Sequence, residues 1–353
     1  MATVRTVLGE ISPDDLGVTM SHEHLLLDTS HLFWDEPSTS DPPEIQALAT
    51  APVTPDNADA VIARPYVSKD NLRMTELDVA IRELQLYRDA GGRSFVDVSG
   101  RIPGWHPDDL VVASEATGVN IVASTGWYIS PAHPPSHAQA GVDDLAEVMV
   151  SHIEVGIEGT DVRAGVIGEL GMTEPLHPQE EKVLRAGARA QGRTGVPLTV
   201  HPMVFKKEAH RYIDILEEEG ANLDKVYISH MDGSCPDYEY HESVMDRGVS
   251  IDYDCFGDTS WNDTHLLFGG DHWISDRERV ETLARLCADG YSRQIMLAQD
   301  RCLKTHLVAY GGKGYAYILT DIVPQLLDAG VTQGQIDDML IENPKRIFAV
   351  DSS

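Results

Sequence analysis

The sequence has few basic residues and no long apolar segment. Its 353 residues include 27 Lys and Arg against 57 Asp and Glu, which gives a formal net charge of −30. Such an acidic surface repels phosphate backbones and anionic lipid head groups, so it argues against nucleic-acid and membrane partners. No apolar run approaches the roughly 18 residues that a membrane span requires, and the N-terminus shows no secretory signal. The expected partner is therefore a small-molecule substrate, and the only protein assembly that we expect is a homodimer.

Cysteine is also scarce and widely spaced. The four cysteines lie at positions 235, 255, 287 and 302, and no CxxC pair occurs. This spacing argues against a thiolate zinc ribbon and against a disulfide scaffold. We therefore expect a reduced, cytoplasmic protein whose cysteines fill space in the core or in loops.

Short apolar segments alternate with amphipathic ones along most of the chain. Eight of them resemble strands buried on both faces of a parallel sheet, and they span residues 17–24, 93–99, 120–126, 164–169, 197–201, 226–230, 249–254 and 294–300. Apolar residues at helical spacing occupy residues 74–90, 141–158, 178–194, 205–219, 236–247, 276–289 and 314–329. Eight strands that alternate with helical segments favour a closed barrel over an open doubly wound sheet.

The predicted fold is an α/β protein with a single (β/α)8 TIM-type barrel domain over residues 1–353. One proline-rich stretch interrupts the alternation of strands and helices, at residues 31–70. It contains few periodic apolar positions, so we interpret it as a long irregular insertion after the first strand. The insertion should lie at the C-terminal face of the barrel, where active sites of this fold are built.

Metal-binding residue types stand at the ends of several predicted strands. His22 and His24 form an HxH pair at the end of the first strand, and alternate strand residues point to the same face. Four further residues end later strands: Glu169, His201, His230 and Asp300. In a barrel these strand ends converge on one mouth, where uncompensated charges and polar groups would be costly. Together the six residues therefore predict a metal site.

The number of candidate ligands favours two ions over one. Four imidazoles and an aspartate exceed the needs of one tetrahedral ion, and the Glu169 carboxylate could bridge two cations. Two divalent ions about 3.5–4 Å apart can share a hydroxide and lower its pKa towards neutrality. Asp300 is the best candidate for the proton acceptor, because it could touch both a metal and that hydroxide. Nitrogen and oxygen ligands suit zinc, although Mn, Co and Fe remain open.

Several stretches carry a resemblance to a known family. They are VLGEISPDDLGVTMSHEHLLLD, GVIGELG, GVPLTVHP, YISHMD, IDYDCFG and the C-terminal AQDRCLKTHLVAYGGKGYAYIL…ENPKRIF. In this order they resemble the phosphotriesterase-related branch of the amidohydrolase superfamily. The resemblance implies a barrel whose binuclear metal centre hydrolyses ester-type bonds. It also implies that His22 and His24 bind the first metal with Asp300, and that His201 and His230 bind the second.

The chain departs from the family pattern at two places. Many members bridge the metals with a carbamylated lysine, whereas this chain has Glu169, as some relatives do. The lactone-hydrolysing branch usually shows Asp-Arg-Tyr-Gly after the seventh strand, but this chain has Asp-Cys-Phe-Gly at 254–257. By the same resemblance, Tyr128 occupies the aromatic position that lines the metal cleft, so we include it among the catalytic residues.

The predicted function is that of a metal-dependent hydrolase. A metal-bridging hydroxide would attack a carboxylic ester, lactone or amide, with Asp300 taking the proton. A phosphotriesterase or other phosphoester hydrolase is the alternative, and a non-catalytic metal- or ligand-binding barrel is the alternative of another class. Histidines in predicted loops could touch the substrate, namely His31, His133, His137, His265 and His272. The others, His106, His152, His177, His210, His241 and His306, are interpreted as surface or helix residues.

Overall fold

A parallel sheet of eight strands forms the centre of the molecule. The computed structural model describes residues 2–258 and 273–351. Each strand pairs with the next one along the chain, in the order β3 (Thr19–Glu23), β6 (Ser94–Asp97), β7 (Asn120–Thr125), β8 (Val166–Gly171), β9 (Leu198–His201), β10 (Val226–Ile228), β11 (Ser250–Tyr253) and β12 (Ile295–Leu297). All eight predicted strands are present, so the predicted α/β barrel class is confirmed.

The two edge strands of this sheet, β3 and β12, approach each other and nearly close the barrel. The Ser21 hydroxyl donates to the Leu297 carbonyl over 3.3 Å. The Asp300 N–H donates to the His22 carbonyl, also over 3.3 Å. The Gln299 N–H donates to the Glu23 carboxylate over 2.8 Å. These bonds across the seam bring the first and last strands, far apart in sequence, to one side of the same mouth.

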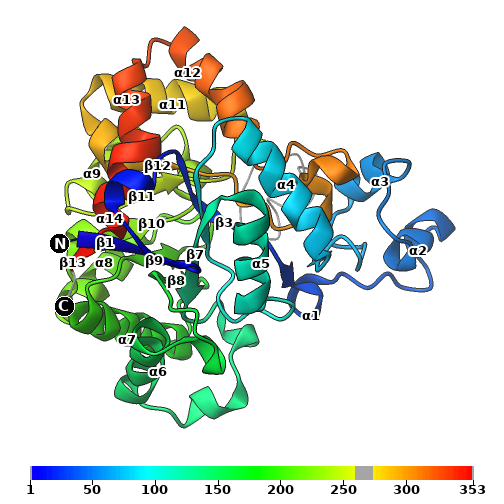
Figure 1. Cartoon of the computed structure of the whole chain (residues 1–353). Coiled ribbons are helices and arrows are strands. Elements are labelled where there is room, and N and C mark those ends of the chain that lie inside the picture. The colour runs from blue at the N-terminus through cyan, green and yellow to red at the C-terminus, as the bar shows by residue number, and fades with distance from the viewer. Residues whose placement is uncertain (1, 259–272, 352–353) are drawn as a thin grey trace.

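Helices surround the sheet (Figure 1). They are α1 (Ser30–Phe33), α2 (Pro43–Thr50), α3 (Ala58–Ala63), α4 (Leu77–Asp89), α5 (Pro107–Thr117), α6 (Val142–Glu154), α7 (Pro178–Thr194), α8 (Ala209–Glu218), α9 (Tyr238–Met245), α11 (Asp276–Ala288), α12 (Val323–Asp328), α13 (Gln333–Asp337) and α14 (Asn343–Phe348). π-Helical turns, Ile318–Ile322 and Asp338–Glu342, precede α12 and α14. No helix of the described chain has both the length and the apolar character that crossing a membrane requires.

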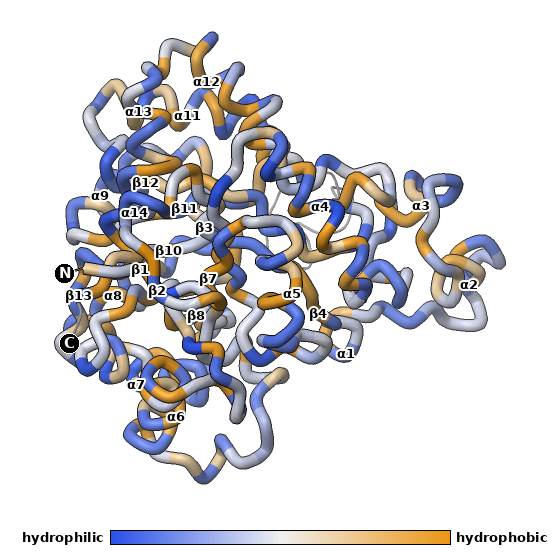
Figure 2. Tube along the Cα trace, in the orientation of Figure 1, coloured by the Kyte–Doolittle hydropathy of each residue, from blue (hydrophilic) through white to orange (hydrophobic). Residues whose placement is uncertain are grey.

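The residues that favour the start and the end of a helix are clearest at α7, whose predicted and observed bounds coincide. Its N-cap is His177, whose side chain accepts a hydrogen bond from the Gln179 N–H, and Glu180 completes a capping box. Pro178 occupies the first turn, where a missing N–H costs nothing, and Gly195 ends the helix with φ of +72°. Figure 2 shows hydrophobic and hydrophilic stretches alternating along the helices, as expected for helices that pack with one face against the sheet.

The structure differs from the prediction in several segments. Residues 31–70 are not irregular throughout. Pro43 begins α2, where its missing N–H costs nothing, and alanines favour both α2 and α3. Helices α5, α13 and α14 were missed. For α5 the signals were Pro107 in its first turn and Gly118 with φ of +72° after its end. Small sheets were missed as well: β1 (Ala2–Thr6) pairs with β2 (Gly9–Ile11) and β13 (Val350–Asp351), and β4 (Leu27–Asp28) pairs with β5 (Arg73–Met74).

Candidate metal centre

The structure brings all six predicted metal-site residues together. His22 lies in β3 and His24 directly follows it, while His201 is the last residue of β9. Glu169 is not the end of its strand as predicted, because β8 continues to Gly171. The pairing of β8 with β9 shifts register between Ile167 and Leu170, and such an irregularity can redirect a side chain.

The remaining two residues follow their strands on unusual backbone. His230 comes after the end of β10 with φ of +56°, and Asp300 comes after the end of β12 with φ of +47°. Residues other than glycine rarely adopt this left-handed region, and such strain collects at functional sites. The His230 conformation is held by its own N–H, which donates to the Asp254 carboxylate over 3.0 Å.

The carboxylate of Glu169 lies at the centre of the four imidazoles. Its Oε2 is 2.7 Å from His201 Nδ1 and 3.3 Å from His22 Nε2, and its Oε1 is 3.5 Å from His24 Nε2. His230 Nε2 lies 2.6 Å from His201 Nδ1. Two sets of potential ligands result, His22–His24–Glu169 and Glu169–His201–His230, each with its ligand atoms within 4.8 Å of one another. The Glu169 carboxylate belongs to both sets, which suits the binding of two neighbouring cations.

Unpartnered buried atoms provide a direct test of whether this cluster fits cations. Asp300 Oδ1 lies 3.1 Å from His24 Nε2 and 3.9 Å from His22 Nε2. Within the described chain, neither Asp300 Oδ1 nor His22 Nε2 has a hydrogen-bond partner, although both atoms are buried. Leaving such groups unsatisfied costs about 1–3 kcal/mol each. The cluster therefore fits divalent ions that accept these lone pairs.

Each imidazole is also held on its other nitrogen. Ser229 lies 2.9 Å from His22 Nδ1, Ser99 3.0 Å from His24 Nδ1, Asp254 2.7 Å from His230 Nδ1, and Tyr128 3.2 Å from His201 Nε2. Partners of this kind fix the orientation and tautomer of a metal-binding histidine. The inward nitrogens are thereby left to face Glu169.

The electrostatics of the cluster suit cation binding. Burial lowers the pKa of His22 and of His201, so both rings stay neutral. Burial also lowers the pKa of His24, but the nearby carboxylates of Asp300 and Glu169 outweigh burial and raise the pKa to about 9. Burial raises the pKa of Glu169, yet the neighbouring histidines hold it well below its usual range. His22 and His201 are therefore neutral imidazoles beside an ionised carboxylate, the kind of ligand that zinc-like ions prefer.

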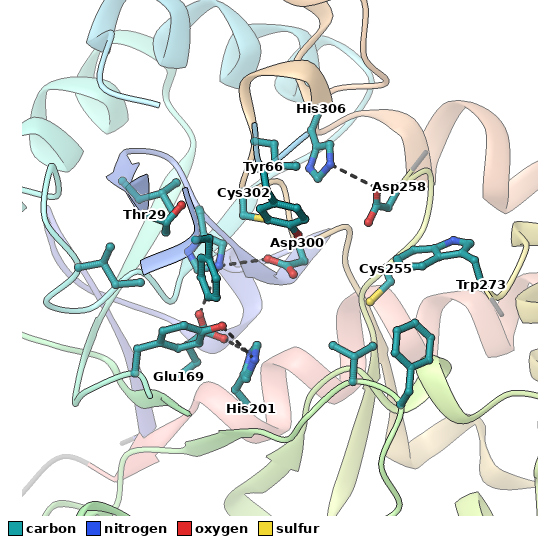
Figure 3. Close-up of a pocket in the computed structure, with 18 residues that line it drawn as sticks. Thr29, Tyr66, Glu169, His201, Cys255, Asp258, Trp273, Asp300, Cys302 and His306 are labelled. Atoms are coloured by element: carbon teal, nitrogen blue, oxygen red, sulfur yellow. Dashed lines mark hydrogen bonds and ion pairs between the residues drawn. The ribbon is translucent and has the colours of Figure 1, made fainter. Parts of the chain in front are cut away.

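A pocket opens above the cluster. The pocket has a volume of about 760 Å³, which includes the space at its opening. Mostly apolar and aromatic side chains line it, together with two cysteines: Leu27, Phe33, Tyr66, Ile102, Val204, Phe205, Cys255, Trp273, Cys302 and Leu303. Figure 3 shows Glu169 and His201 at one end, His306 and Asp258 at the other, and Asp300 between them. Tyr128 also lines the pocket. A group bound here would lie against aromatic walls beside the candidate metal ligands.

The sequence prediction missed some of the lining residues. His306, interpreted as a surface or helix residue, is 5% exposed and lines the pocket. Its position six residues after Asp300, in the loop that follows the last strand, was the available signal. His152 and His241 are helix residues, in α6 and α9, and both are buried. Of the predicted loop histidines, His31, His133 and His137 do not line the pocket, and His265 and His272 lie outside the described residues.

The loop after β11 is fixed by a buried arginine from α11. Arg279, 1% exposed, donates to the Asp232 carboxylate over 2.6 Å, and the same carboxylate oxygen accepts from the Cys255 N–H over 3.0 Å. In the Asp-Cys-Phe-Gly stretch, Asp254 therefore holds His230 while Cys255 faces the pocket. No arginine comes from this loop itself.

Comparisons with known proteins agree with this geometry. The model of the phosphotriesterase family matches residues 2–348. An N-acetyltaurine hydrolase from Danio rerio is 37% identical over 346 residues, which cover 97% of each chain. The crystal structure of a resiniferatoxin-binding protein from Rhodobacter sphaeroides is similar with a TM-score of 0.93 and 36% identity, covering 98% of this chain and 94% of that one. A lactonase from Listeria monocytogenes superposes with a TM-score of 0.76 and 25% identity, covering 99% and 100% of the two chains.

The predicted resemblance and the predicted hydrolase function are therefore confirmed. The chain is a metal-dependent hydrolase of amide, ester or lactone bonds. It belongs to the phosphotriesterase family.

Proposed function

We propose that this protein is a binuclear amide hydrolase in which two divalent ions would share the Glu169 carboxylate. His22, His24 and Asp300 would hold one ion, and His201 and His230 the other. The observation that carries this assignment is the shared Glu169 carboxylate, which belongs to both sets of potential ligands. Bound ions of this kind activate a water molecule and polarise the scissile carbonyl.

The side chains of the site then have separate roles. Asp300 accepts the proton of the attacking water and returns it to the departing amine, which must be protonated to leave. Burial raises the pKa of Asp300, but the adjacent His24 holds it below its usual range, so the carboxylate is ionised and able to take up a proton. Tyr128 positions His201 through its hydroxyl and presents its ring to the pocket.

Amides are the proposed first substrates, with esters and lactones next. The N-acetyltaurine hydrolases among the relatives support a short N-acyl group, and the similarity to a lactonase supports related carboxyl derivatives. The phosphoester alternative has less support, because no Lys or Arg among the described residues lines the pocket to clamp a phosphoryl group. A purely binding role leaves the proton acceptor at Asp300 without a use.

Finer properties are proposed on chemical grounds. Zinc is the proposed ion, because four imidazoles with carboxylates form a nitrogen and oxygen ligand set. A cytoplasmic location and a homodimer stay predictions, as does the assignment of residues 1–353 to a single domain. All four cysteines are free thiols, as a reducing compartment would maintain them.

Metal analysis combined with a matched substrate panel tests the proposal. Protein purified without chelator should carry two divalent ions per chain, and removing them should abolish hydrolysis until zinc is restored. The panel consists of an N-acetyl amide, an acetate ester, a γ-lactone and a trialkyl phosphate, all with similar leaving groups. We expect kcat/KM for the carboxyl compounds to exceed that for the phosphate. Full activity without metal, or a preference for the phosphate, would contradict the proposal.

A further inference from the structure

The far end of the pocket carries a polar pair that the proposed mechanism does not use. Among the described lining residues, the ionisable groups at the metal end are Glu169, Asp300 and the histidines beside them, while His306 and Asp258 occupy the other end. His306 Nε2 lies 3.4 Å from Asp258 Oδ1. The walls between the two ends are mostly apolar or aromatic. This pair is therefore a charged and polar feature that the part of a substrate that is not cleaved could contact.

His306 is buried without satisfying its hydrogen-bonding capacity. Its side chain is 4% exposed, and neither ring nitrogen has a hydrogen-bond partner within residues 2–258 and 273–351. The contact with Asp258 is close enough for an ion pair but is not aligned as a hydrogen bond. A buried polar group left in this state costs about 1–3 kcal/mol. A ligand group that bonds to the ring would recover that cost.

The backbone around His306 is firmly anchored, so the ring is preorganised. The single-turn helix Lys304–His306 is tied to the segment before α4. Buried Lys304 pairs with Asp70 over 3.0 Å and with Glu76 over 2.6 Å. The Thr305 N–H donates to Asn71 Oδ1 over 2.9 Å. A binding group held in this way loses little entropy when a ligand arrives.

We infer that His306 and Asp258 recognise an uncharged hydroxyl-type group on the substrate, and that the pocket rejects an anionic group at this place. The inference rests on the proposed function, because it concerns the part of the substrate beyond the bond that is cleaved. A hydroxyl can donate to the Asp258 carboxylate and accept from a His306 N–H at the same time. The pair therefore suits a group that is both donor and acceptor.

An anionic group meets the opposite situation. A sulfonate or carboxylate only accepts hydrogen bonds, and here it would face the Asp258 carboxylate in a pocket that no described Lys or Arg lines. Residues 259–272, which follow Asp258 in the sequence, contain no Lys or Arg either. The His306 N–H could donate to such an anion, but burying a second negative charge beside the Asp258 carboxylate is costly. On this argument the preferred substrate differs from a taurine amide, whose amine part carries a sulfonate.

The test uses N-acetyl amides of straight-chain amines, two to six carbons long, that end in methyl, hydroxyl or sulfonate. With the metal-loaded protein, we expect kcat/KM at the best chain length to be at least about tenfold higher for the hydroxyl than for the methyl ending. The sulfonate ending should be the poorest of the three. Preference for the sulfonate, or equal rates for hydroxyl and methyl endings, would overturn the inference.

Variants assign the preference to the pair. His306→Phe should bring the hydroxyl-to-methyl ratio of kcat/KM close to one, and Asp258→Asn should raise the rate of the sulfonate compound relative to the hydroxyl compound. His210→Phe on α8 is the matched control, since this histidine contacts Ser243 away from the pocket and should keep the wild-type ratio. Metal content and melting temperature establish that each variant is folded. A wild-type ratio in folded His306→Phe would overturn the inference.

A binding measurement separates this inference from the proposed function. The hydroxyl-ended and methyl-ended ketones, with CH2 in place of the amide NH, resist hydrolysis and can be titrated calorimetrically into the metal-loaded protein. We expect a lower Kd for the hydroxyl ketone that depends on His306. If none of the amides is cleaved, the proposed amide hydrolysis fails, and these Kd values still decide the role of the pair. If the amides are cleaved but the two Kd values are equal, the inference alone fails.

Discussion

Replacing the bridging carboxylate is the most direct test of the two-ion site. Glu169→Gln preserves the side-chain volume but removes the anionic oxygen that lies 2.7 Å from His201 Nδ1 and 3.3 Å from His22 Nε2. Because Glu169 belongs to both potential ligand sets, each ion would lose one anionic ligand. Both ions should therefore bind more weakly, and together.

The expected magnitude follows from the number of ligands lost. Losing even an outer partner of a metal ligand costs about 10–100-fold in affinity, so losing a direct ligand should cost at least about 100-fold for each ion. This corresponds to about 3 kcal/mol per ion. At a fixed zinc concentration, the free energy by which each bound ion stabilises the folded protein should fall by a similar amount. The gain in melting temperature on adding zinc should shrink accordingly.

The assay measures metal per chain after dialysis, melting temperature with and without zinc, and kcat/KM for the best amide. Glu83→Gln is the matched control, because Glu83 is also buried but accepts from the N–H groups of Val308 and Ala309, away from the cluster. The control should lower stability equally with and without zinc, and keep two ions. Two tightly bound ions and an undiminished zinc-dependent gain in Glu169→Gln would refute the bridging role. Since Glu169 needs no carbamylation, reconstitution of the wild type should not depend on bicarbonate.

Other side chains give further predictions. Asp300→Asn keeps an oxygen near His24 but removes the base, so kcat should fall by about 10²–10⁴-fold with metal content largely retained; wild-type turnover would exclude the proton-transfer role. Tyr128→Phe removes the partner of His201 Nε2, so a chelator should extract metal at about 10–100-fold lower concentration, and unchanged extraction would contradict the positioning role. Burial lowers the pKa of His241 to about 4, from 6.5 in the unfolded chain. Between pH 6.5 and 4 the unfolded chain therefore binds a proton at His241 that the folded protein does not, and the free energy of unfolding should fall by up to about 3 kcal/mol over this range. Urea unfolding of His241→Asn should show a shallower decline with pH than the wild type. The same decline in both proteins would refute this prediction.

The sequence by itself determined the order of the strands and much of the metal centre. Buried parallel strands appear as short apolar runs, so the run at 226–230 predicted β10 (Val226–Ile228), and apolar residues at helical spacing predicted α7 (Pro178–Thr194). Both signals are local. The barrel mouth then required no further information, since parallel strands that close into a barrel bring their C-terminal ends together. His201 and His230 could be placed side by side for that reason alone.

Only the tertiary structure decided how the centre is completed. The register shift in β8 directs Glu169 between four imidazoles, and the seam between β3 and β12 places Asp300 beside His24. Neither can be inferred from periodicity, because pairing register depends on residues far apart in sequence. His306 was missed for the same reason: its burial comes from contacts of its loop with the segment that precedes α4. A local pattern records which face of an element is apolar, whereas the partner that covers a loop is known only once the chain is folded.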